Sequence, residues 1–198
     1  ALPIFSGTAT DSGPRGRAPR DEAREVAVES LTRLTAITQP GSLEELARGG
    51  AAGAASLSRA VDSAAVAVLP ALSRGQVLVA LDAWGRRELT GRTPVLLGAL
   101  GTGGEALATP VVDALSAAGL TASAVALDTA LGRQDAASLL PLLDARYISG
   151  DAAAFEEFQR AVASARDRST AALRTVLATA QQARVAAEPW QSSVPDFR

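Results

Sequence analysis

Apolar positions recur at helical spacing through much of the chain. An amphipathic stripe predicts a helix over residues 20–35, and an Ala-rich pattern predicts a buried helix over 52–72. The same spacing predicts helices over 105–118 and 135–146. A last long helix is expected to begin at Gly150-Asp151 and to bury one apolar stripe along its length.

Short apolar runs between these helices are typical of buried strands. Residues 77–81 and 93–100 form two such runs, and small and apolar residues alternate over 121–127 as a third strand candidate. The order is helices, then a small sheet with interleaved helices, then helices again. This order predicts an α+β fold in which N-terminal and C-terminal helices flank a small sheet.

Residues that end or cap helices indicate further boundaries along the chain. Residues 1–19 are rich in Gly, Pro, Ser and Arg and predict a flexible arm, which leaves 20–198 as a single domain. Ser42 and Glu45 have the spacing of a capping box, so a short helix is expected to start at Ser42. The glycines at 101–104 predict a flexible turn.

Composition excludes several kinds of chemistry. The 198 residues contain neither Cys nor His, and all 19 basic residues are Arg. Disulfides, zinc sites with Cys or His ligands, catalytic triads with His and Schiff-base lysines are therefore impossible. The formal net charge of −2 gives no field that would hold the chain on nucleic acid. Because there is neither a run of apolar residues that could span a bilayer nor a leader pattern, we expect a cytoplasmic protein that is not bound to membranes.

The segment 77–97 carries the most specific motif. Trp84, Gly85, Arg86, Glu88 and Leu89 follow an apolar run, and a second apolar run comes after them, which predicts a strand, a tight turn at Gly85-Arg86 and a second strand. It resembles the signature of the protein-PII uridylyltransferases and their adenylyltransferase relatives, in which a strand runs into Gly-Gly-Tyr-Gly-Arg-x-Glu-Leu and then Ser-Asp-x-Asp.

A second segment agrees with the same family. Its pattern Leu-Leu-Asp-Ala-Arg-x-x-x-Gly-Asp matches this chain from Leu142 to Asp151. Near the end of the chain only Glu188-Pro189 and a terminal apolar-Arg pair agree. The resemblance covers the extent of one nucleotidyltransferase domain and implies a mixed sheet of that type.

The resemblance also shows what has been lost. The two metal-binding Asp positions of the family fall on Pro94 and Leu96, and its Gly-Gly pair falls on Asp82-Ala83. Nucleotidyl transfer needs Mg²⁺ held by oxygen ligands, which Pro94 and Leu96 do not offer. We therefore expect no catalytic residue, no metal and no cofactor, and a degenerate, non-catalytic domain.

The remaining candidate residues have a functional and a structural interpretation. Gly85, Arg86 and Arg87 are the possible phosphate-binding residues. The family match implies structural roles for four further residues: Glu88, Asp144, Arg146 and Asp151. Glu88 is expected to pair with an Arg or a helix, and Asp144 with Arg146.

Other side chains suggest weaker alternatives. Asp82, Glu88 and Asp128 lie beside predicted strand ends and could rebuild a metal site, although Asp128 is better explained as the cap of a turn. Trp84 is expected to pack under the turn. Trp190 lies in a polar tail and could anchor another protein.

Three functions remain open at this stage. The first is a protein-binding regulatory or structural subunit, whose partner is another protein or a second copy of the chain. The second is an active nucleotidyltransferase that modifies a PII-like signalling protein through a non-standard metal site. The third is a sensor that binds nucleotide without turnover.

Overall fold

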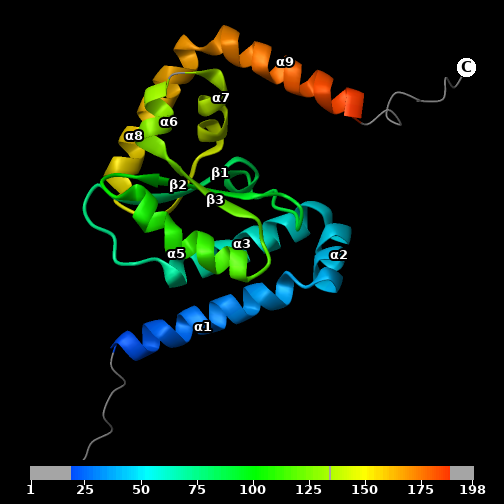
Figure 1. The fold of residues 1–198 in the computed structure, drawn as a ribbon, viewed down its shortest axis with the longest axis vertical. Helices are drawn as coiled ribbons and strands as arrows, with labels where there is room; N and C mark the ends of the chain where they lie inside the picture. Colours follow the sequence, from blue (N-terminus) through cyan, green and yellow to red (C-terminus); the bar gives the residue numbers. More distant parts are fainter. Residues whose placement is uncertain (1–18, 134, 188–198) are drawn as a thin grey trace, which may run out of the picture.

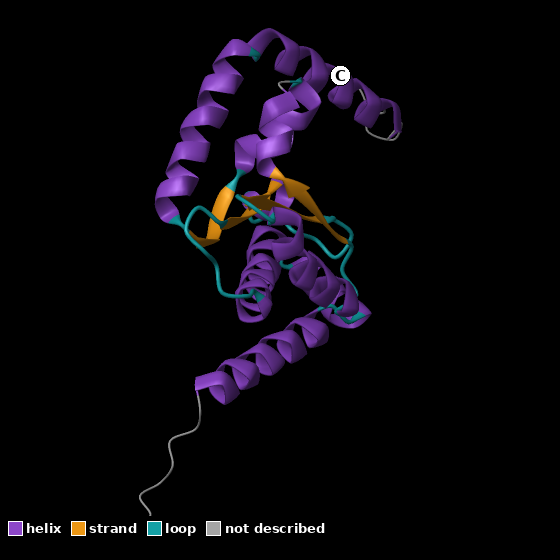
Figure 2. Ribbon diagram, turned by 60° about the vertical axis from the view of Figure 1, so that its left-hand side comes forward, coloured by secondary structure: helices purple, strands orange, loops and turns teal. Residues whose placement is uncertain are grey.

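The computed structural model describes residues 19–133 and 135–187, in which helices cover both faces of a four-stranded sheet (Figure 1, Figure 2). The α+β fold expected from the sequence is confirmed. The strands, all short, are β1 (Val77–Leu81), β2 (Val95–Leu100), β3 (Ala122–Ala126) and β4 (Arg146–Gly150). Their order is β3-β2-β1-β4, with β1 antiparallel to β2 and to β4, and β2 parallel to β3. The sheet is therefore mixed.

Strand β1 lies at the centre of the molecule. All five of its residues are fully buried, because strands flank it and helices cover both faces. This burial explains why its sequence is an unbroken apolar run rather than an alternating one. The predicted span of this strand is confirmed to the residue.

One face of the sheet is covered by helices from the first half of the chain. These are α3 (Gly50–Val68) and α5 (Gly104–Ala117), while α1 (Pro19–Ile37) and α2 (Pro40–Arg48) pack against α3. Their side chains form one apolar core with Leu78, Ala80 and Leu97 of the sheet. Small residues on α3 allow α1 and α5 to pack closely against it.

Helices from the second half cover the opposite face. They are α6 (Leu127–Arg133), α7 (Ala136–Leu139), the 3₁₀ helix η1 (Leu140–Asp144) and α8 (Ala152–Arg168), while α9 (Thr170–Ala187) packs against α7 and α8. Their core includes Phe155 and Phe158 of α8 and contacts Val79 and Leu81 of β1. Each face of the sheet thus has its own apolar core.

The helix predicted over 135–146 is wrong in its second half. A four-residue helix, α7, is followed by η1, and Arg146 begins the edge strand β4, which the sequence analysis did not predict. Pro141 has no backbone N–H to donate and its ring disfavours a continuous α-helix. The chain therefore tightens into a 3₁₀ turn and leaves the helix before Arg146.

The last helix is two helices rather than one. Helix α8 ends at Arg168 and α9 begins at Thr170, with Ser169 between them. The backbone N–H of Ser169 still donates to Ala165, while its carbonyl accepts the first bond of α9 from Leu173. The break lets Leu173 turn into the core beside α7.

Two local predictions also need correction. The short helix starts at Pro40 with Gln39 as its N-cap, so Ser42 is not a cap and no capping box forms. Proline is favourable at this first helical position because its missing N–H would have no helical partner there. The connection between β1 and β2 is a one-turn helix, α4 (Asp82–Gly85), followed by a loop, rather than one tight turn.

Candidate functional site

The segment with the family motif lies at the end of β1, where it contacts the junction between η1 and β4. Helix α4 starts directly from the buried strand, and η1 packs against it. The backbone φ angles of Asp82 and Arg87 are +51° and +63°, which L-residues adopt at a cost. Asp82 stands where the resembling family has glycine, the residue for which this conformation is favourable.

Arg86 is surrounded by three carboxylates. Its guanidinium donates to Glu88 at 2.8 Å and to Asp82 at 3.0 Å, and it also pairs with Asp144. We call these four residues the Arg86 cluster. Glu88, and then Asp144 and Asp82, raise the pKa of Arg86 above its ordinary value, although partial burial opposes this shift. With one cation and three anions, the cluster has a formal charge of −2.

A second cluster of charged and polar side chains lies near the Arg86 cluster and is more deeply buried. Arg146 donates two hydrogen bonds to the carboxylate of Asp62 on α3, at 2.9 and 3.0 Å. Asp62 also accepts from the indole N–H of Trp84 at 2.8 Å. Trp84 is fully buried, which confirms that it packs under the turn. We call these three residues the Asp62 cluster, and together they join α3, α4 and β4.

Of the two ion pairs predicted from the sequence, the structure contains one. Glu88 pairs with an arginine, as predicted. The predicted pair of Asp144 with Arg146 is wrong, because Asp144 binds Arg86 and Arg146 binds Asp62. The sequence analysis overlooked Asp62, although a lone carboxylate on an otherwise Ala-rich helix signals a buried partner.

Gly85 is required by packing rather than by a ligand. A Cβ atom at this position would lie 1.9 Å from the carbonyl oxygen of Asp144 and 3.1 Å from that of Ala80. Arg146 also donates to the carbonyl oxygen of Gly85 at 3.3 Å. The backbone of the turn thus lies directly against the end of η1, and this contact leaves no room for a side chain at position 85.

Arg87 differs from its neighbour. Its side chain is exposed and forms no ion pair with a described residue, whereas Arg86 forms three. Of the three residues considered for phosphate binding, only Arg87 presents a cation that is free to meet a ligand.

The residues at the two positions where the resembling family has its metal-binding Asp residues do not fit Mg²⁺. Pro94 precedes β2 and is exposed, while Leu96 lies on β2 and packs against the core beneath α6 to α8. Asp128 cannot complete a site with Asp82 and Glu88, because it binds the N–H of Gly101 at the far end of β2. Among residues 19–133 and 135–187, no group of three Asp or Glu side chains could hold a metal ion.

Asp151 is the N-cap residue of α8. Its carboxylate caps α8 by accepting from the N–H groups of Ala153 and Ala154, and it also accepts from the N–H of Gly75 at 2.9 Å. The bond from Gly75, followed by the bond from Ala154, lowers the pKa of Asp151 below its ordinary value. Asp151 thus ties the start of α8 to the loop before β1.

Acid is expected to weaken this contact. Because the folded-state pKa of Asp151 is lowered, its contribution to stability is present above the unfolded-state value of about 3.9 and is lost as the pH falls through the folded-state value. Replacing Asp151 with Asn should therefore reduce the free energy of unfolding at about pH 6 but hardly at about pH 2. Urea unfolding at both pH values measures this difference, with Asp113→Asn on the exposed side of α5 as the control.

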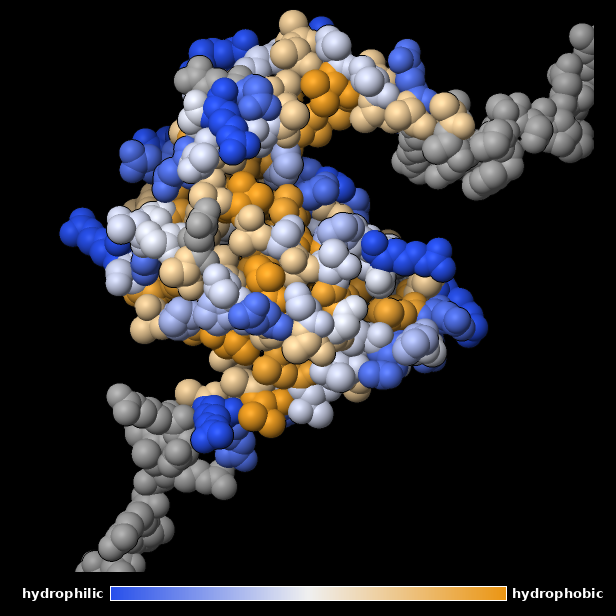
Figure 3. Space-filling view, in the orientation of Figure 1, coloured by the Kyte–Doolittle hydropathy of each residue, from blue (hydrophilic) through white to orange (hydrophobic). Residues whose placement is uncertain are grey.

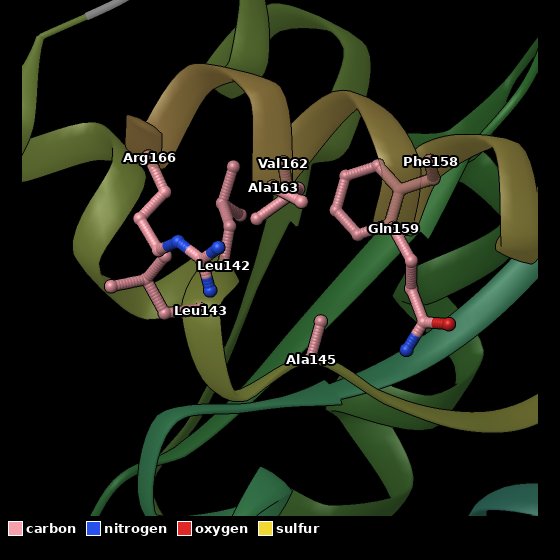
Figure 4. Close-up of a pocket in the computed structure, with 8 residues that line it drawn as sticks. All are labelled: Leu142, Leu143, Ala145, Phe158, Gln159, Val162, Ala163 and Arg166. Atoms are coloured by element: carbon pink, nitrogen blue, oxygen red, sulfur yellow. The ribbon is translucent and has the colours of Figure 1, made fainter. Parts of the chain in front are cut away.

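A pocket of about 340 Å³ with both apolar and polar lining groups lies between η1 and α8 (Figure 4). Leu142, Phe158 and Val162 form its apolar part, while Arg166 and Gln159 contribute the polar groups at its two ends. Arg166 is already paired with Asp167. The lining contains no carboxylate and no hydroxyl group, so it offers a surface for an apolar group and no acid-base chemistry.

Replacing Arg87 with glycine is expected to raise the free energy of unfolding by about 1 kcal/mol, because glycine adopts the φ of +63° without strain. Arg87→Ala removes the same charge but keeps the strain, and should change stability by less than about 0.5 kcal/mol. Urea unfolding of the two variants compares them directly. Equal stability of the two variants would contradict the strain argument.

None of the helices described over 19–133 and 135–187 has the length and hydrophobicity needed to cross a bilayer. Trp190, considered as a protein anchor, lies outside the described residues, as does the arm except for Pro19. Comparison of the chain with protein-family models, with curated proteins and with solved structures gave no match.

Proposed function

We propose that this chain is a non-catalytic nucleotidyltransferase-like protein that acts by binding, as a regulatory or structural subunit. The observation that carries the proposal is the pair Pro94 and Leu96, which stands where the resembling family holds its metal. Neither side chain has an oxygen ligand, and Leu96 packs into the core. Mg²⁺ needs a near-octahedral set of oxygen atoms, so no metal-assisted transfer is supported there.

The charges around Arg86 support the same conclusion. A nucleotide triphosphate approaching Arg86 would meet three carboxylates already bound to it, within a cluster of net charge −2. Phosphate binding at this position would cost both the existing ion pairs and the repulsion between anions. The motif residues therefore act as ion-pair partners that hold the turn to η1.

The exposed Arg87 favours a second candidate, a sensor that binds nucleotide without turnover. Its guanidinium pairs with no described residue, and the same holds for the exposed Arg92 farther along the segment 77–97. One exposed arginine gives little affinity in water, since single surface charge pairs contribute about 0–1 kcal/mol. Binding through Arg87 alone is thus expected to be too weak to serve a sensor.

Calorimetry with ATP and with UTP separates the candidates. We expect no heat of binding with either nucleotide, with or without Mg²⁺. Binding that requires Mg²⁺ would support an active transferase and refute the proposal. Binding that is independent of Mg²⁺ and lost in Arg87→Ala would support the sensor instead. The matched control is Arg48→Ala, which removes an exposed arginine from α2, away from the motif.

A further inference from the structure

Strand β3 leaves one edge of the sheet open. It pairs with β2 on one side, and no described strand pairs with its other side. The N–H of Val95 donates to the carbonyl of Thr121 at 2.8 Å, and in a parallel ladder Ser123 and Val125 continue the bonds to β2. The N–H and C=O groups of Ala122 and Ala124 consequently point away from the sheet. These groups can bind another extended backbone.

The two edges of the sheet differ in how they are protected. Strand β4 has a register shift opposite Leu78 and Val79. Bulges and charges are the usual features that keep edge strands from pairing with other chains. Strand β3 has an unbroken register, no charged residue and no proline. An exposed edge of this kind is a template for pairing.

The chain segment that forms this edge carries few charges. Among the described residues from Ala106 to Leu127, which form most of α5 and all of β3, Asp113 is the one charged side chain, although a fifth of the whole chain is charged. Helix α5 packs beside β3 (Figure 1), and in Figure 3 orange and pale residues lie there with some blue ones among them. Interface centres are depleted of charge in the same way.

We propose that β3 pairs antiparallel with β3 of a second copy of this chain, around a two-fold axis at Ala124. Pairing of β3 with β4 of another copy would build an open filament, and the bulge in β4 opposes it. Pairing of β3 with itself is closed, and without charges on β3 the copies meet no like-charge repulsion at the strand. Small side chains at Ala122, Ser123 and Ala124 allow the strands to approach.

This inference rests on the proposed binding function and names the partner as a second copy. The antiparallel register would place the two Ala124 Cα atoms about 5.5 Å apart, because the outward groups of Ala124 form a hydrogen-bonded pair. That separation is compatible with a disulfide. The two α5 helices would then lie beside the axis, and one sheet would continue through both copies.

Cross-linking of the full chain tests the geometry. Because the chain has no cysteine, Ala124→Cys introduces a single thiol at the expected axis. Under mild oxidation we expect a covalent dimer to form at least about tenfold faster than with Ala178→Cys, a control at an exposed site on α9. Equal rates for the two variants would overturn the proposed axis.

Sedimentation velocity tests the association itself. The wild-type chain is expected to be dimeric at about 100 μM and Ala124→Arg monomeric, because two charges would meet at the axis. Ala178→Arg should remain dimeric. A monomeric wild type, or a dimer that survives Ala124→Arg, would overturn the inference. Calorimetry with nucleotide tests the binding function separately, so a failed dimer with no nucleotide binding would still allow a different protein partner.

Discussion

Replacing Asp62 with alanine is expected to lower the free energy of unfolding by about 2–3 kcal/mol. The change removes the carboxylate that binds Arg146 twice and that accepts from the buried indole of Trp84. A buried ion pair that loses one partner typically costs 3–5 kcal/mol, and the smaller value reflects side chains that are 23% exposed. Equilibrium unfolding in urea measures the loss.

Controls distinguish the charge from the hydrogen bonds. Asp62→Asn keeps an oxygen for the indole of Trp84 and should cost less than Asp62→Ala. Replacing both partners, with Asp62→Leu and Arg146→Met, should be much less harmful than the sum of the single changes, because no unpaired charge is left. Asp167→Ala removes a solvent-exposed partner of Arg166 and is expected to cost less than about 0.5 kcal/mol. A similar loss for Asp62 and Asp167 would contradict the structural role of the Asp62 cluster.

The contacts of Asp62 are an example of ion pairs that the sequence alone did not predict. The pairs Asp62–Arg146 and Arg86–Asp144 join residues 84 and 58 positions apart. Local spacing predicts contacts within one helix or turn, and the family match implied only that Glu88 pairs with an Arg or a helix. The distant pairs exist only because β4 lies beside β1, and β4 was not predicted.

The elements that were predicted correctly are those in which apolar side chains follow one regular pattern along the sequence. Strand β1 is buried on both faces and reads as a continuous apolar run, and α5 has an apolar stripe that ends near Gly119. The segment around β4 has no such pattern. Its residues Arg146 and Tyr147 are held by the Asp62 cluster and by Phe155 rather than by an alternating buried face. Tertiary contacts, not the local pattern, make it a strand.

The same contacts give the residues of the motif a structural explanation. The resemblance to a nucleotidyltransferase signature directs attention to Gly85 and Arg86 as groups for binding phosphate. In the structure both belong to the interface between the turn and η1, with Arg86 bound to Asp144 and Gly85 against its carbonyl. Gly85 and Arg86 thus have a packing role that does not depend on a bound phosphate.

Replacing Gly85 with alanine tests this packing role directly and is expected to lower the free energy of unfolding by about 3 kcal/mol. The new methyl group would lie 1.9 Å from the carbonyl oxygen of Asp144, so the backbone of the turn or of η1 must shift. Gly132→Ala is the matched control, because a Cβ there meets nothing within 4 Å and α6 should gain about 0.5–1 kcal/mol. Urea unfolding should thus give changes of opposite sign. A Gly85→Ala variant as stable as the wild type would show that the turn does not depend on this contact, and would reopen a ligand-binding explanation for the glycine.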